Sequence, residues 1–278
     1  MCFFLCIPAM LFNYIFGIQS KSLLNIVMLE ILILSLVQGI TEFLPISSSS
    51  HIILFSKFMN FISEDLILNV SLHIGSFLAV IVFFRKEILS FFIYRKIFML
   101  IIIASFPIVL SGYLIAESGI INDLRSLKII GWTTVLFGIL LYFSDKFVVS
   151  KSFNENLNLK NIFIIGLVQV LALIPGASRA GIVITGSRFL NFNRFDAAKI
   201  SFILSIPALL GASVLTLKDT FVKEEIINLN IVLGIIFSYI FSYLTIKYFL
   251  IYTKNFSLNI FVIYRIFLSL ILFYFIYF

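Results

Sequence analysis

Six long apolar segments set the fold of this 278-residue chain. They lie near residues 66–84, 97–116, 128–143, 199–217, 228–246 and 257–278. Each is close to the roughly 20 residues that an α-helix needs to cross the hydrocarbon core of a bilayer. Only 12% of the residues are charged, about half the share expected of a soluble domain. The sequence therefore predicts an all-α polytopic integral membrane protein with about six to eight transmembrane helices.

The apolar pattern predicts a single membrane-embedded domain over residues 28–278. Residues 1–27 precede it and lack the basic start and small-residue cleavage site of a signal peptide. We expect them to form an extra anchor helix, or to reflect a start site assigned too far upstream. Cys2 and Cys6 both fall in this extension, so neither a disulfide framework nor a thiolate metal site can extend across the chain.

The net charge of +7 would suggest a nucleic-acid partner in a soluble protein, but here most basic residues lie in one set of loops between the apolar segments. Loops 85–96, 145–160, 188–199 and 247–256 hold twelve Lys or Arg and four acidic residues. Loops 57–65, 117–128 and 217–227 hold five basic and seven acidic residues. Because Lys and Arg collect on the cytoplasmic side, the first set is predicted to be cytoplasmic and the second external. We expect contact with membrane lipids and no nucleic acid.

One segment, 161–187, connects two loops predicted to lie on the same side and is too short to cross the membrane twice. PGASRAG (175–181) lies at its midpoint and predicts a re-entrant hairpin of two half-helices meeting at a Pro-Gly break. LVQGITEFLPISSS (36–49) resembles LVQVLALIPGASR (167–179), with Leu-Val-Gln, then a proline, then serine. Hairpins entering from opposite sides form an inverted repeat, with a ligand site where the broken helices meet.

Two ionisable residues lie at these breaks, Glu42 in the first and Arg179 in the second. A charge at membrane depth is costly unless it is paired or hydrated, so it marks a functional site by default. The simpler alternative is a structural ion pair that holds the two hairpins together. Four consecutive serines, residues 47–50, and Ser178 exceed what such a pair needs, because isolated serines in membrane helices usually bond backbone carbonyls.

These residue types suit phosphoryl transfer. Arginine binds phosphate oxygens bidentately, and the free N–H groups of half-helix N-termini add an anion site. A serine hydroxyl or a water can attack phosphorus while His51 or Glu42 moves the proton. Gln38 and Glu42 lie at i and i+4 on one helix face and can hold Mg²⁺ or Ca²⁺ through oxygen atoms. We expect His73 to be structural or to support the site, and Arg265 to anchor packing.

The motifs QGITEFLPISSSSH (38–51) and PGASRAG (175–181) resemble those of the bacterial undecaprenyl-diphosphate phosphatase family of the bacitracin-resistance type. The resemblance covers nearly the whole chain from about Met28, more weakly in HIGSFLAVIVFFR (73–85), SFILSIPALLGA (201–212) and IYRIF (263–267). It implies a metal-dependent multi-pass enzyme of the bacterial inner (plasma) membrane, with its site open to the periplasmic side. Such an enzyme hydrolyses undecaprenyl diphosphate to the monophosphate, recycles the lipid carrier of peptidoglycan synthesis and confers bacitracin resistance. Whether the protein forms a homodimer is left undecided by the sequence.

The resemblance also implies roles for individual residues. Ser48 corresponds to the proposed nucleophile, with His51 and Glu42 as the other catalytic groups. Arg179 corresponds to the phosphate-binding arginine. The neighbouring hydroxyls expected to bind the diphosphate are Ser47, Ser49 and Ser178. Glu42 and Gln38 would hold the divalent metal, although many members of the family carry a glutamate where this chain has Gln38.

Two other classes of protein share parts of this pattern. A transporter of a lipid or an anion also uses inverted repeats and broken helices, but it needs no nucleophile. Lipid phosphatases of the acid-phosphatase-like class combine serine, histidine and arginine, but they need a histidine after the arginine, and none follows His73 here. Phosphate release from a prenyl diphosphate distinguishes the enzyme from the transporter.

Overall fold

A computed structural model describes residues 27–48, 50–52, 54, 66–93, 95–119, 124, 126–221 and 229–277. The predictions for residues 1–26 and for Ser49 therefore lie outside the described residues. The first described helix is Val27–Thr41. It is followed by α3 (Leu66–Phe83), α4 (Arg85–Ile93), α5 (Arg95–Ser118), α7 (Leu127–Asp145), α8 (Phe153–Asn156), α9 (Leu159–Gln169), the 3₁₀ turn η1 (Val170–Leu173), α10 (Arg179–Phe189), α11 (Arg194–Phe221), α12 (Leu229–Asn255) and α13 (Asn259–Tyr277). The predicted all-α class is confirmed.

Five of the described helices are long and apolar enough to cross a bilayer. They are Ile97–Ser118, Leu127–Asp145, Arg194–Val214, Leu229–Asn255 and Asn259–Tyr277. Three shorter apolar helices accompany them: Val27–Thr41, Leu68–Phe83 and Leu159–Leu173. Large apolar side chains such as Phe106 and Ile263 are 64% and 67% exposed, as expected of helix faces that contact lipid rather than water. The prediction of a polytopic membrane protein is confirmed.

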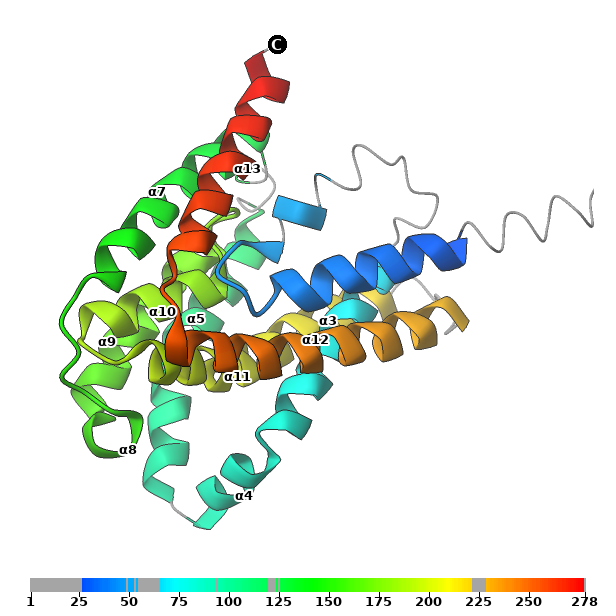
Figure 1. Cartoon of the computed structure of the whole chain (residues 1–278). Coiled ribbons are helices and arrows are strands. Elements are labelled where there is room, and N and C mark those ends of the chain that lie inside the picture. The colour runs from blue at the N-terminus through cyan, green and yellow to red at the C-terminus, as the bar shows by residue number, and fades with distance from the viewer. Residues whose placement is uncertain are drawn as a thin grey trace, which may run out of the picture.

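The helix packing repeats between two halves of the chain with the partners exchanged (Figure 1). Helix Val27–Thr41 packs against α12 at Gly39, where an added Cβ would lie 2.6 Å from the Cβ of Phe241. In the same way α9 packs against α5 at Gly166, where an added Cβ would overlap the backbone carbonyl of Ala104. Similarly, α3 contacts α12, and α11 contacts α5. The first arm of each hairpin therefore lies on a helix of the other half, as a two-fold internal repeat predicts.

Small residues and hydroxyl groups allow α3 and α12 to approach closely. Gly75 on α3 faces the backbone of α12 so tightly that a Cβ would overlap the carbonyl oxygen of Ile235. Ser76 Oγ lies 3.1 Å from Ser238 Oγ and 2.9 Å from Ser242 Oγ. Small residues and interhelical hydroxyl bonds are the usual means of holding helices together where lipid offers no hydrophobic driving force.

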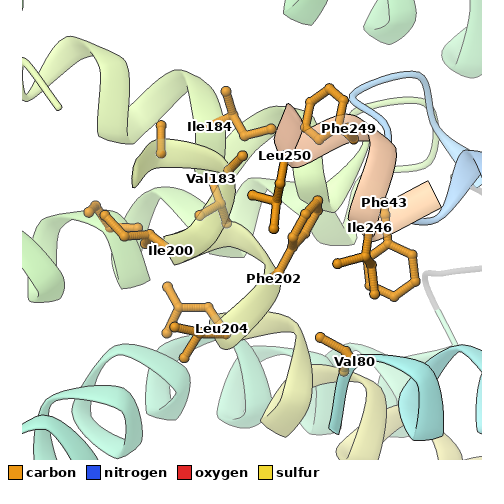
Figure 2. Packing of buried hydrophobic residues seen from close by; sticks show 14 of the residues in the cluster. Phe43, Val80, Val183, Ile184, Ile200, Phe202, Leu204, Ile246, Phe249 and Leu250 are labelled. Atoms are coloured by element: carbon orange, nitrogen blue, oxygen red, sulfur yellow. The ribbon is translucent and has the colours of Figure 1, made fainter. Parts of the chain in front are cut away.

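The central core connects the first helix break to α11 and α12 (Figure 2). Phe43 lies edge-on to Phe202, with ring centroids 5.4 Å apart, and Phe202 lies 5.9 Å from Phe249. All three rings are buried. Phe43 directly follows Glu42, so burial of its ring fixes the backbone that carries this carboxylate.

The four basic loops meet at one end of the molecule. Lys199 Nζ lies 3.4 Å from Glu87 Oε1, which joins the start of α11 to α4. Arg194 Nε lies 2.7 Å from Asp145 Oδ1, which joins α11 to the end of α7. Lys151 forms an isolated β-bridge with the turn before α11. Lys254 Nζ of the fourth loop lies 4.9 Å from the ring centroid of Phe195. These contacts agree with the prediction that the four loops share one side of the membrane.

Candidate active site

The first helix break places a carboxylate and a hydroxyl on the two sides of one turn. Helix Val27–Thr41 ends just before Glu42, whose amide still donates to the carbonyl of Gln38 at 2.9 Å. Ser47 then has a φ of 75°, a left-handed conformation that costs a non-glycine residue roughly 1–2 kcal/mol. Helical backbone resumes at Ser48. Because of this turn, Ser48 Oγ donates a hydrogen bond of 2.8 Å to Glu42 Oε2.

The second break also has a serine with a positive φ at the corresponding position. Ser178, immediately before α10, has a φ of 69°, close to the value at Ser47. Each serine follows the glutamine of the repeated Leu-Val-Gln by nine residues, Gln38 in the first hairpin and Gln169 in the second. Gly176, with a φ of 89°, makes the preceding bend. The similarity between the two sequence motifs therefore extends to their local structure.

The tips of the two hairpins meet through side chains that are far apart in the sequence. Arg179 Nη2 donates to Glu42 Oε1 at 2.9 Å across a separation of 137 residues. Gln38 Nε2 donates to the other carboxylate oxygen at 3.1 Å. Ser178 Oγ donates to the carbonyl of Leu44 at 3.4 Å. The glutamate and arginine side chains are only 7% and 12% exposed, so their charges neutralise each other away from bulk solvent.

A cavity of about 240 Å³ lies between the two breaks. Its polar lining is contributed by both hairpins and by α3: Thr41, Glu42, Ser47, Ser48, His73, Ser178 and Arg179. Apolar residues of α5, η1 and α11 complete the walls, among them Ile108, Leu173 and Leu209. The structure thus gathers five of the predicted site residues around one cavity. Gln38 is buried behind Glu42 rather than in the lining.

The two histidines occupy different positions relative to this cavity. His51 is not among the lining residues; its Nδ1 lies 2.6 Å from the carbonyl oxygen of Ser47 and its Nε2 2.6 Å from Tyr264 Oη. A carbonyl only accepts, so Nδ1 carries the proton, and Nε2 of the neutral ring accepts from the tyrosine. His51 therefore ties the Ser47 turn to α13, and its catalytic role stays a prediction. His73 lines the cavity from α3, with Nδ1 bonded to the carbonyl of Asn69 at 2.8 Å.

Arg265 on α13 binds both hairpin tips from a fully buried position. Its Nη1 donates to the carbonyls of Pro45 (3.2 Å) and Ala177 (3.1 Å), and its Nη2 to the carbonyl of Gly176 (2.8 Å). Its Nε donates to Thr134 O at 3.1 Å. Helix breaks leave carbonyls without helical partners, and one guanidinium satisfies several of them. The expected packing role is confirmed. In the sequence, Arg265 stands out as a lone charge in an apolar segment, but this does not show which segments it joins.

Few groups are available to hold a divalent cation in the part of the chain that the structure describes. It contains no cluster of three or more His, Cys, Asp or Glu side chains. The Oε1 atom of Gln38 is buried and has no hydrogen-bond partner among the described residues. Mg²⁺ commonly binds one or two carboxylates together with substrate phosphates. Glu42 lines the cavity and therefore fits a cation that is also bound by phosphate oxygens, whereas Gln38, buried behind it, would have to turn its amide to present Oε1 to the same cation.

A cavity lined by a glutamate–arginine pair and several hydroxyl groups, enclosed by two broken helices, is typical of a polytopic membrane protein with a ligand site where its hairpins meet. Residues 31–271 match the family model described as Bacitracin resistance protein BacA. The chain belongs to this family.

Related proteins from several bacteria carry the same name, undecaprenyl-diphosphatase. That of Pelagibacter ubique (strain HTCC1062) is 53% identical over 90% of this chain and 98% of the relative. That of Alteromonas mediterranea (strain DSM 17117 / CIP 110805 / LMG 28347 / Deep ecotype) is 37% identical over 89% and 98%. That of Alcanivorax borkumensis (strain ATCC 700651 / DSM 11573 / NCIMB 13689 / SK2) is 37% identical over 87% and 97%. The similarity therefore covers nearly the full length of each relative.

Proposed function

We propose that this protein is a phosphatase that hydrolyses undecaprenyl diphosphate to undecaprenyl phosphate and inorganic phosphate. The observation that carries the proposal is the 2.8 Å hydrogen bond from Ser48 to Glu42, with Arg179 on the other carboxylate oxygen. A transporter needs an anion site but no hydroxyl bonded to a carboxylate. The name of the relatives supports the choice of substrate. The reaction recycles the lipid carrier of peptidoglycan synthesis and confers bacitracin resistance.

Glu42 is placed to take the proton of Ser48, because it already accepts the hydrogen bond from that hydroxyl. Ser48 Oγ attacks the terminal phosphorus, the phosphoanhydride bond breaks, and undecaprenyl phosphate leaves. Water then cleaves the phosphoserine, releasing inorganic phosphate and returning a proton to the serine oxygen. In the alternative route Ser48 orients a water that attacks phosphorus directly, and Glu42 takes the proton of that water.

Arg179 binds and stabilises the transferring phosphoryl group. Its Nη2 is held by Glu42, and its Nη1 donates to the carbonyl of Ser201 at 3.3 Å, so the planar guanidinium is oriented before substrate arrives. Its remaining N–H bonds can face phosphate oxygens, and such pre-oriented donors are most effective where charge develops. Ser47 and Ser178 line the same cavity, and the Ser178 hydroxyl can bind the diphosphate by exchanging its 3.4 Å bond to the carbonyl of Leu44 for one to a phosphate oxygen.

The proposed cofactor is a divalent cation, Mg²⁺ or Ca²⁺. Glu42 and the buried Oε1 of Gln38 would hold it together with oxygens of the diphosphate. When bound, the cation neutralises charge on the phosphate groups.

We also propose that the cavity opens to the periplasmic side of the bacterial inner membrane. Helix α10 begins at Arg179 beside the cavity and leads to Arg188 at the end where the basic loops meet. Basic loops favour the cytoplasmic side, so the cavity end faces away from the cytoplasm.

Phosphate release from undecaprenyl diphosphate by the purified protein tests this function. We expect activity in the wild type and a loss of at least about 100-fold in kcat for Ser48→Ala, because both routes need this hydroxyl. Ser205→Ala is the matched control: Ser205 is also buried, but its hydroxyl bonds the backbone carbonyl of Phe202. An inactive wild type contradicts the phosphatase function, whereas an active Ser48→Ala contradicts only the role of this serine.

A further inference from the structure

We propose that a second site, formed by Arg194 and Lys254 at the end of the molecule where the basic loops meet, binds a phosphate group. A cavity of about 520 Å³ opens there, between the end of α7, the turn from α10 to α11 and the end of α12. Its charged lining consists of Asp145, Arg188, Arg194 and Lys254. Arg188 follows Arg179 by nine residues, which is about 14 Å along an α-helix, so this cavity is separate from the active site.

The single carboxylate of this cavity is already occupied. Asp145 accepts a bidentate pair from Arg194, Nε to Oδ1 at 2.7 Å and Nη2 to Oδ2 at 3.0 Å. Its Oδ2 also accepts from the amide of Leu258 at 3.0 Å. Arg188 Nε lies farther away, 3.5 Å from Oδ1. Three cationic side chains therefore share one anion, and the cavity holds an excess of positive charge.

Arg188 contributes a buried charge that its hydrogen bonds do not neutralise. Its side chain is 2% exposed, and its Nη2 donates to the backbone carbonyls of Asp145 and Phe147, both at 2.9 Å. Carbonyl oxygens satisfy the N–H groups but carry no net charge. A buried ion without a counter-ion of its own is costly, and an anion in the cavity would offset that cost.

Arg194 and Lys254 are the groups free to contact such an anion. The Arg194 side chain is 34% exposed, and its pair with Asp145 uses one edge of the guanidinium, leaving Nη1 for a ligand. Lys254 is exposed; its Nζ lies 4.9 Å from the ring centroid of Phe195 and forms no ion pair with any described residue. An arginine fork beside a lysine is a typical binding arrangement for phosphate.

The cavity is wider than a phosphate ion requires, and part of its wall is apolar. Phe147 and Val149 line it and are 47% and 53% exposed. A phosphate that carries an apolar substituent, as in an anionic phospholipid, would cover these side chains. Basic pockets between transmembrane helices on the cytoplasmic side bind anionic headgroups in this manner. Free inorganic phosphate shares the same recognition chemistry but would leave the apolar wall uncovered.

Native mass spectrometry of the full-length protein in detergent, with equimolar dioleoyl phosphatidylglycerol and phosphatidylethanolamine, tests the site. We expect the wild type to retain phosphatidylglycerol preferentially. The double variant Arg194→Gln/Lys254→Gln should reduce that preference about tenfold or more, because each basic residue near an anionic headgroup contributes to binding. Lys254→Gln alone leaves the Asp145–Arg194 pair intact and should still weaken retention.

The matched control is Lys160→Gln/Lys247→Gln, which removes the same charge from two exposed lysines that do not line the cavity. It should retain phosphatidylglycerol as the wild type does. Equal loss in the control, or no lipid preference in the wild type, overturns the proposal. Displacement of the lipid by excess inorganic phosphate assigns the site to free phosphate, whereas persistence assigns it to the headgroup. The readout is binding, so it stands apart from the test of phosphatase activity.

Discussion

At the scale of single residues, Glu42 organises the active site. Its two carboxylate oxygens accept from Arg179, Ser48 and Gln38. Gln38 lies before the first break and Ser48 after it, whereas Arg179 begins α10 after the second break. A purely structural ion pair would need the arginine alone. Because the hydroxyl of Ser48 shares this carboxylate, one side chain contacts both the proposed nucleophile and the proposed phosphate-binding arginine.

We predict that Glu42→Gln lowers kcat about 10²- to 10⁴-fold, the usual contribution of a general base. Glutamine has nearly the same shape but cannot take a proton from Ser48. Steady-state phosphate release measures the effect. Glu87→Gln is the control, because Glu87 makes a partly exposed ion pair with Lys199 away from the cavity. Wild-type kcat in Glu42→Gln would show that another group moves the proton.

We predict that Arg265→Met lowers both the thermal stability and the activity of the protein. The substitution leaves carbonyls of both breaks without a donor, and each buried unsatisfied group costs about 1–3 kcal/mol. Thermal unfolding in detergent and phosphate release measure the two effects. Arg85→Met, which removes an exposed arginine from α4, should leave both nearly unchanged. If Arg265→Met matched that control, the two breaks would be held together by other contacts.

The sequence predicted some residues of the site and not others, for a physical reason. Glu42, Arg179 and the serine run 47–50 could be singled out because polar groups at a break in an apolar segment are costly at membrane depth, whereas the choice of Ser48 within that run rests on the family resemblance. The bond between His51 and Tyr264 joins residues 213 positions apart, and it depends on the rotation of α13 about its axis. The placement of His73 in the cavity depends in the same way on how α3 packs. No local pattern encodes either.

At the scale of elements, the broken helices are held by close packing at glycine. The positions of the apolar helices and of both breaks could be predicted, because length, hydropathy and Pro-Gly signals are local. The pairing of each hairpin with a helix of the other half could not, because many small residues lie on several helix faces. Gly39 and Gly166 identify the faces that meet.

We predict that Gly166→Ala destabilises the protein and reduces its activity, whereas Gly112→Ala has little effect. A Cβ at Gly166 would overlap the backbone carbonyl of Ala104 on α5, so α9 would have to move away. Gly112 also faces the second hairpin, but a Cβ there would make an ordinary 3.6 Å contact with Leu173. Thermal unfolding of both variants, with phosphate release, measures the difference. Equal stability of the two variants would mean that α9 and α5 can separate at little cost.

At the scale of the whole molecule, the candidate site and the basic loops lie apart along α10. The active-site cavity lies where the hairpins meet, and the basic loops gather at the far end of α10. The loop charges predicted that the four basic loops share one side, and the contacts between these loops agree with that prediction.

We predict that an impermeant maleimide modifies Ser118→Cys but not Lys160→Cys in intact spheroplasts. Both positions are exposed: Ser118 ends α5 at the predicted external side, and Lys160 lies in a predicted cytoplasmic loop. Cys2 and Cys6 are replaced by serine so that the label reports one site. Opening the membrane should make Lys160→Cys reactive as well. The reverse pattern would place the cavity on the cytoplasmic side.

The hydrogen bonds from Arg265 to both hairpin tips have a consequence for biosynthesis. The hairpins emerge from the ribosome early and midway, but the side chain that joins them lies in α13, which follows every other described helix along the chain. The link that Arg265 makes between the two tips can therefore form only after α13 has been synthesised. A nascent chain that has inserted all its earlier helices still lacks the side chain that binds the carbonyls of both breaks.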